Sequence, residues 1–139
     1  MSPLKKFGPK SGGSYLDLAK ARWGADMPDW IEALALATDA APSQATLNAK
    51  LKFKSASVIS GLISRTYPGK LDKLEAVVRG ALMHEIVRCP VQGTIARDVC
   101  IQNQKRKFSS ANPRAAQLWA ACRAGCPHAL ADALKEGAR

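Results

Sequence analysis

Four cysteines are the residues of this chain best suited to binding a metal, and none of them lies before residue 89. They are Cys89, Cys100, Cys122 and Cys126. Four thiolates match the ligand number of a tetrahedral Zn²⁺ and of a cubane iron–sulfur cluster equally well. Their spacing differs from the paired C-x2-C of zinc ribbons, and a proline follows Cys89 and Cys126, as in the bacterial ferredoxin run. A metal site is therefore one interpretation of these residues, and within it the pattern favours an iron–sulfur cluster over Zn²⁺.

Two other interpretations of these residues stay open. His84 or His128 could replace one cysteine as a ligand. Alternatively, the four thiols bind nothing and pack as small, partly buried hydrophobic side chains.

The sequence offers no argument for catalysis. It has two histidines, no glycine-rich phosphate loop, no obvious pair of catalytic acids and no nucleophile signature. We expect that the protein is not an enzyme.

The segments that carry the cysteines form a small C-terminal subdomain, expected at residues 84–139. Asn112-Pro113 is typical of a helix start, and the helix that follows carries Leu118, Trp119 and Cys122. Gly125 then releases the chain before Cys126.

Residues 14–83 are expected to form a helical bundle. A helix from Ser14 presents Leu16 and Trp23 to a core and ends at Gly24, and a second one starts near Pro28. Apolar residues at helical spacing in 71–83 predict a further helix. The fold class is therefore all-α, and strand patterns are scarce.

Two short helices joined by a tight turn are predicted within residues 43–65. Leu47 and Leu51 share one face of the first, and Ser55 stands where an N-cap belongs for the second. The second helix, expected from Ser55 to Arg65, has a slim face that includes Ala56 and Gly61. Such a pair of helices is typical of a DNA-reading helix-turn-helix; an ordinary solvated hairpin is the alternative.

Charge supports the same interpretation. The chain carries a formal net charge of +10, and no carboxylate occurs between Asp39 and Asp72. Residues 1–42 balance at five basic and five acidic side chains, so the excess lies in the centre and the tail. A basic surface of this kind indicates a polyanionic partner such as double-stranded DNA.

The predicted DNA-binding residues combine phosphate-binding cations with short polar side chains for the bases. They are Lys50, Lys52, Lys54, Ser55, Ser57, Ser60, Ser64, Arg65 and Lys70. Because these side chains offer few long polar groups, we expect modest direct readout and a strong dependence on salt. In a homodimer, the two reading helices would lie about 34–36 Å apart.

The remaining composition fits a globular protein of one domain. Apolar residues make up 47% of the chain and charged residues 23%. No apolar run approaches the length of a membrane span, and residues 1–13 form a basic arm without the hydrophobic region of a secretory signal. We therefore expect a flexible arm at 1–13, no membrane partner, and a cytoplasmic location.

The sequence from about Tyr15 to His128 resembles a family of small regulators from Mu-like transposable phages and prophages. The shared markers are Trp23-Gly24, Met27-Pro28-Asp29-Trp30, Ser43-Gln44, Val58-Ile59-Ser60, Tyr67-Pro68-Gly69, Val78-Arg79-Gly80-Ala81-Leu82-Met83, Cys89-Pro90-Val91, Gly93-Thr94-Ile95, Cys100, Asn112-Pro113 and Cys122-Arg123-Ala124-Gly125-Cys126-Pro127-His128. The chain departs from the family at Leu51-Lys52-Phe53-Lys54, where a Leu-Gly pair is commoner.

The resemblance implies a sequence-selective, helix-turn-helix transcription regulator of phage type that acts in the cytoplasm of a bacterial host. Two other functions remain as alternatives. One is a sensor whose metal or iron–sulfur cluster controls DNA binding. The other is a protein–protein adaptor in a phage transposition complex.

Overall fold

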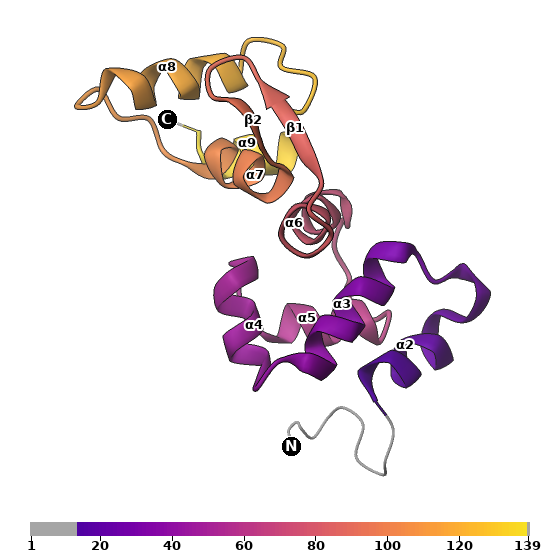
Figure 1. The fold of residues 1–139 in the computed structure, drawn as a ribbon. Helices are drawn as coiled ribbons and strands as arrows, with labels where there is room; N and C mark the ends of the chain where they lie inside the picture. Colours follow the sequence, from indigo (N-terminus) through magenta and orange to yellow (C-terminus); the bar gives the residue numbers. More distant parts are fainter. Residues whose placement is uncertain (1–13, 139) are drawn as a thin grey trace. The chain divides into compact units, whose positions relative to one another are not determined.

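The structure is a computed structural model that describes residues 14–138. The predicted arm at 1–13 lies outside the described residues. The described chain is mostly helical, with one small sheet, and it divides into two compact units after Gly69 (Figure 1). The predicted mainly helical architecture is confirmed.

The first unit is built from helices whose starts are marked by capping side chains. The Ser14 hydroxyl accepts from the Asp17 amide and Asp17 bonds back to Ser14, so α2 begins with a capping box. The Ser43 hydroxyl likewise accepts from the Thr46 amide at the start of α4. The elements are α2 (Tyr15–Trp23), the 3₁₀-helix η1 (Gly24–Asp26), α3 (Asp29–Ala40), α4 (Gln44–Leu51) and α5 (Ser57–Ile63).

The core of the first unit lies where α2, α3, α4 and α5 meet. Its fully buried side chains include Ile31, Leu34, Leu51 and Ile59. Trp23 packs at the edge of this core and its indole N–H donates to the Leu62 carbonyl over 3.0 Å. The bond ties the end of α2 to α5.

The second unit surrounds one central helix with other helices and a β-hairpin. Its elements are α6 (Asp72–Met83), β1 (Ile86–Cys89), β2 (Gly93–Ala96), α7 (Arg97–Lys105), α8 (Pro113–Cys122) and α9 (Ala131–Glu136). The strands pair antiparallel, with Ile86 opposite Ala96 and Cys89 opposite Gly93. The central helix is α7, which contacts α6, α8, α9 and both strands.

Two sequence predictions need correction in this unit. The hairpin was missed, because its strands are only four residues long and their sequences, IVRC and GTIA, show no clear alternation of apolar and polar residues. The boundary predicted after residue 83 is also wrong, since α6 belongs to the second unit. Gly80 lets α6 approach α7 so closely that a Cβ at this position would overlap the Asp98 backbone amide.

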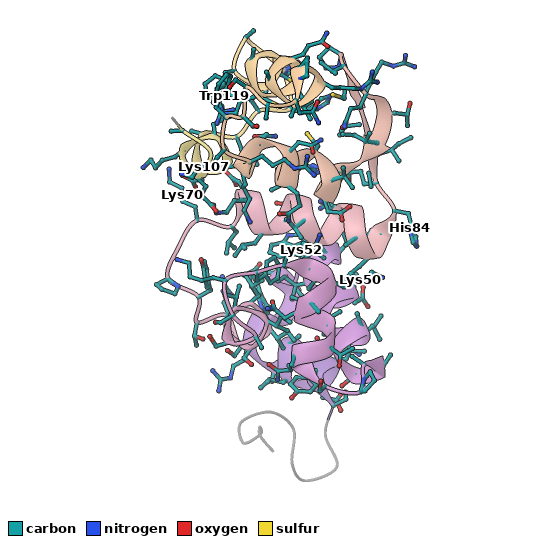
Figure 2. All side chains as sticks on the ribbon, turned by 90° about the vertical axis from the view of Figure 1, so that its left-hand side faces the viewer. Lys50, Lys52, Lys70, His84, Lys107 and Trp119 are labelled. Carbon is teal, nitrogen blue, oxygen red and sulfur yellow. The ribbon has the colours of Figure 1, made fainter. Side chains whose placement is uncertain are left out.

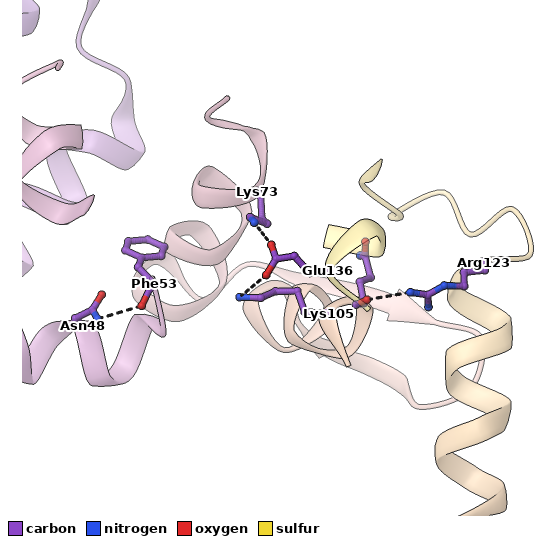
Figure 3. Close-up of polar contacts among 7 residues, drawn as sticks. Asn48, Phe53, Lys73, Lys105, Arg123 and Glu136 are labelled. Atoms are coloured by element: carbon purple, nitrogen blue, oxygen red, sulfur yellow. Dashed lines mark hydrogen bonds and ion pairs between the residues drawn. The ribbon is translucent and has the colours of Figure 1, made fainter. Parts of the chain in front are cut away.

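The end of the chain is fastened to the second unit by polar contacts. Glu136 of α9 forms ion pairs with Lys73 of α6 and Lys105 of α7 (Figure 3). The Trp119 indole donates to the Gly137 carbonyl over 2.9 Å. Helix α9 is therefore held against α6, α7 and α8.

None of the helices between residues 14 and 138 combines the length and apolar character that a membrane crossing requires.

Two glycines in helices should respond oppositely to substitution by alanine. Gly80→Ala should destabilise the second unit by about 1–3 kcal/mol, because its methyl group must displace the backbone of α7. Gly61→Ala is the matched control in α5, where a Cβ would meet Tyr67 at an ordinary 3.5 Å. It should stabilise the first unit by about 0.5–1 kcal/mol through helix propensity.

Native-state hydrogen exchange measures both effects, because it reports on each unit separately. Equal stability changes of the same sign in the two variants would contradict the close approach of α6 and α7.

Candidate functional site

The first candidate site is the segment between α4 and α5, residues 50–57, which we call the basic turn. Lys50 lies in the last turn of α4 and Lys52 closes that helix (Figure 2). Lys54 follows within the turn, and all three lysines are exposed. The structure thus places three of the predicted phosphate-binding residues along one short, exposed segment.

Lys52 sets the geometry of the basic turn. Its backbone is left-handed, with φ 60° and ψ 37°, and its amide donates to the Asn48 carbonyl. The Asn48 side chain in turn donates to the Phe53 carbonyl over 3.2 Å (Figure 3), and the Phe53 ring is buried. Lys52 therefore occupies a conformation in which glycine is normally preferred.

The start of α5 differs from the prediction. The helix begins at Ser57, and its N-cap position is Ala56, which makes no side-chain bond. The Ser55 hydroxyl pairs instead with the Ser57 hydroxyl at 2.6 Å. Both serines are exposed, so they stay accessible, but Ser55 does not cap the helix.

Most of the predicted reading face of α5 is covered by the protein itself. Ser60 donates to the Gln44 side chain of α4 over 2.8 Å, and Gly61 faces Tyr67. Ser64 is only 5% exposed, and its hydroxyl donates to the Ser60 carbonyl. The prediction that Ser64 reads bases is corrected, because its hydroxyl is buried and bonded within the helix. Ser60 is half-buried and already has a partner.

Sequence reasoning missed the side chain that orders these elements. Gln44 receives the Ser60 hydrogen bond and donates to the Tyr15 hydroxyl over 2.9 Å. This amide therefore links α2, α4 and α5. Gln44 directly follows the Ser43 N-cap and so lies in the first turn of α4. This position was the only feature of the sequence that pointed to Gln44.

The other two predicted phosphate-binding residues, Arg65 and Lys70, lie outside residues 50–57. The Arg65 guanidinium lies 4.8 Å from the centre of the Trp23 ring and pairs with Asp26 at 3.9 Å. Arg65 therefore helps to close α5 onto α2. Lys70 is exposed, but it begins the second unit.

The second candidate site is a small pocket lined by all four cysteines of the chain. They come from four segments: Cys89 ends β1, Cys100 lies in α7, Cys122 ends α8, and Cys126 follows in the next loop. We call this the cysteine pocket. Its cavity measures about 10 Å³, and its other lining residues are Pro90, Ile95, Asn103, Gln104, Ala121, His128 and Ala129.

Two neighbouring amide side chains of α7 hold the walls of the cysteine pocket. Gln104, only 1% exposed, donates to the His128 carbonyl over 3.0 Å and accepts from the Leu130 amide over 2.8 Å. Asn103 donates to Gln92 in the hairpin turn over 2.8 Å. The loop after α8 and the tip of the hairpin are thereby both fixed to α7.

Arg123 holds the end of α8, which carries the pocket residue Cys122. Its guanidinium donates to the Leu134 carbonyl over 2.8 Å and lies 4.2 Å from the centre of the Trp119 ring. Arg123 directly follows Cys122, so these contacts set the position of that cysteine at the end of α8.

The two innermost thiols resist ionisation. Burial raises the pKa of Cys100 and Cys122, and the charges of the other cysteines raise it further. Hydrogen bonding from Gln104 and the charge of Arg97 oppose this shift in the pKa of Cys100, and Arg123 opposes it at Cys122. The mutual influence of the thiols shows that they lie near enough to interact electrostatically.

In this structure the four thiols are not arranged as the ligands of a metal ion. Among residues 14–138, no three Cys, His, Asp or Glu side chains are arranged so that they could hold a metal ion. The Cys100 sulfur instead accepts a 3.4 Å hydrogen bond from Gln104. The predicted ligands are thus brought to one pocket but not to a common centre.

Comparison with protein-family models, with curated proteins and with solved structures gives no match. The resemblance to phage regulators therefore stays a prediction from the sequence.

The left-handed conformation of Lys52 can be tested with a pair of glycine variants that remove the same charge. Lys52→Gly should stabilise the first unit by about 0.5–1 kcal/mol, because glycine adopts this conformation without strain. Lys50→Gly should destabilise it by about 1 kcal/mol, since Lys50 has a helical backbone. Urea unfolding, followed by the amides of α4, measures the difference; destabilisation by Lys52→Gly would contradict the turn geometry.

The role of Gln104 can be tested against its neighbour Gln102. Gln104→Ala should destabilise the second unit by about 1–3 kcal/mol, because the His128 carbonyl and the Leu130 amide lose their partner. Gln102→Ala, at a half-buried position of the same helix, should change stability by less than about 0.5 kcal/mol. Thermal unfolding of the two variants measures these stability changes. Equal losses of stability in both would refute the role of Gln104 in holding the loop after α8.

Proposed function

We propose that this protein is a non-enzymatic regulator that binds double-stranded DNA through the basic turn. One observation carries the proposal: Lys50, Lys52 and Lys54 are all exposed on a single short segment. Between residues 14 and 138 the structure shows no ion pair for any of the three. Their charge is therefore available to an outside anion.

Three of the five acidic side chains of the first unit bond to groups other than these lysines. Asp39 accepts from the backbone amides of Tyr15 and Leu16 at the start of α2, over 2.7 and 3.2 Å. Asp17 completes the capping box of α2, and Asp26 pairs with Arg65. None of these carboxylates neutralises the basic turn, which supports an interaction with phosphate groups.

The proposed contact with bases is smaller than the sequence predicted. Ser55 and Ser57 are the exposed short polar side chains of the basic turn, whereas Ser60 is half-buried and Ser64 is buried. Two hydroxyl groups support limited discrimination between bases, since either can contact several base edges. Affinity should therefore come mainly from phosphates and should fall steeply with salt.

A role in transcription is the part of the proposal that rests on sequence resemblance. The resemblance to phage-type regulators, together with the free lysines of the basic turn, favours a DNA-binding regulator over a protein–protein adaptor. An adaptor would have no need of a salt-sensitive, phosphate-binding surface.

The proposal predicts how charge removal changes DNA binding. In Lys50→Gln/Lys54→Gln, the plot of log binding constant against log salt concentration should flatten by about 0.9 for each lysine that contacts a phosphate. Fluorescence anisotropy of a labelled duplex, titrated between about 50 and 200 mM salt, measures the slope.

Lys20→Gln/Arg22→Gln provides a matched control, because these residues are exposed in α2 of the same unit. The control removes the same charge away from the basic turn and should leave the slope within error of the wild-type value. Identical slopes for the two double variants would refute the assignment of the basic turn, and an absence of salt-sensitive binding by the wild-type protein would refute the proposed function.

A further inference from the structure

We propose that the cysteine pocket binds a single Zn²⁺ ion through Cys89, Cys100, Cys122 and Cys126. The inference is independent of DNA binding, because the pocket lies entirely within the second unit.

All four cysteines of the chain meet at one pocket. The four cysteines are spread over four different segments, yet each of them lines the same pocket. Gln104 holds the segment next to Cys126, Asn103 holds the hairpin turn next to Cys89, and both belong to the helix that carries Cys100. The polar network of α7 thus brings together residues that lie far apart in the sequence.

The small size of the pocket favours a single Zn²⁺ ion over an iron–sulfur cluster. Its cavity of about 10 Å³ is close to the space that one water molecule needs. A single ion requires less displacement of the surrounding segments than a cluster of four irons and four sulfides. The structure therefore favours Zn²⁺ over the iron–sulfur cluster that the sequence pattern favoured.

The chemistry of the walls also fits zinc. Four sulfur donors are a common ligand set of structural zinc sites, and soft thiolates select Zn²⁺ over oxygen-seeking metals.

Binding requires a local rearrangement of the thiols. Each sulfur must come within about 2.3 Å of the ion, and the described side chains do not meet at such a point. Cys89 and Cys126 are only half-buried, one at the end of a strand and the other in a loop, so movement of these two thiols disturbs the core least. The Cys100 sulfur can keep its hydrogen bond from Gln104, because a metal-bound thiolate still accepts hydrogen bonds.

The first experiment measures metal on the full chain, purified under reducing conditions. Elemental analysis should find one zinc and no iron per chain. After chelation, titration with Co²⁺ should saturate at one equivalent and show the thiolate-to-cobalt charge-transfer absorption and ligand-field bands of a tetrahedral site with four sulfurs. Colourless, metal-free protein that fails to bind Co²⁺ would overturn the proposal. So would brown protein containing iron and acid-labile sulfide.

Variants then locate the site. Cys100→Ser and Cys122→Ser should each lower Co²⁺ affinity by at least tenfold. Two histidine variants serve as controls: His84→Ala changes a residue that does not line the pocket, and His128→Ala changes one that does. Both histidine variants should still bind one equivalent of Co²⁺ and should show the absorption spectrum of a site with four sulfurs. Loss of a ligand in His128→Ala would overturn the four-cysteine assignment.

Thiol reactivity in the wild-type chain decides the question even if the cysteine variants do not fold. The zinc-loaded protein should protect all four thiols from alkylation, and chelation should expose them. Four thiols that react at the same rate with and without zinc would overturn the proposal.

Discussion

Hydrogen bonds of amide side chains tie separate segments together in both units of the protein. In the second unit, the buried Gln104 bonds to the loop that follows α8, which draws this loop onto α7. In the first unit, the half-buried Gln44 joins Tyr15 to Ser60, which links three helices. Loss of the Gln104 amide would leave the His128 carbonyl and the Leu130 amide without this partner, at a cost in stability.

The same polar bonds determine which surfaces remain for function. The bond between Ser60 and Gln44 occupies the middle of α5, so its exposed polar side chains lie at the start of the helix. The lysines gather beside this end, while Asp39 bonds to the start of α2 and Asp26 pairs with Arg65. A surface of this kind favours attraction to phosphates over discrimination between bases. In the second unit, the bonds of Gln104 surround the cysteines with protein, which suits a structural metal better than a reactive thiol.

Local features of the structure could be predicted from the sequence because their signals are local. Asn112 caps α8 as its Asn-Pro start predicted, and Gly24 follows α2 as expected. Features that depend on distant partners could not. The sequence places Ser64 on a polar face, but only the fold shows that its hydroxyl is buried. It shows four cysteines, but their meeting in one pocket depends on Gln104 and on a hairpin without a clear strand pattern. The sequence showed Lys52 in a segment where the resembled family commonly has a Leu-Gly pair. The structure shows why glycine suits this position, since Lys52 ends α4 in a left-handed conformation.

The most direct test of the central claim, that DNA meets the basic turn, is a titration of ¹⁵N-labelled protein with duplex DNA followed by amide chemical shifts. The account predicts that the largest shift changes fall on residues 50–57 and shrink as salt is added, because screening weakens the contacts with phosphates. It also predicts that the exposed face of α2 around Lys20 changes little. The largest changes on α2 or α3 with residues 50–57 unaffected, or changes insensitive to salt, would contradict it.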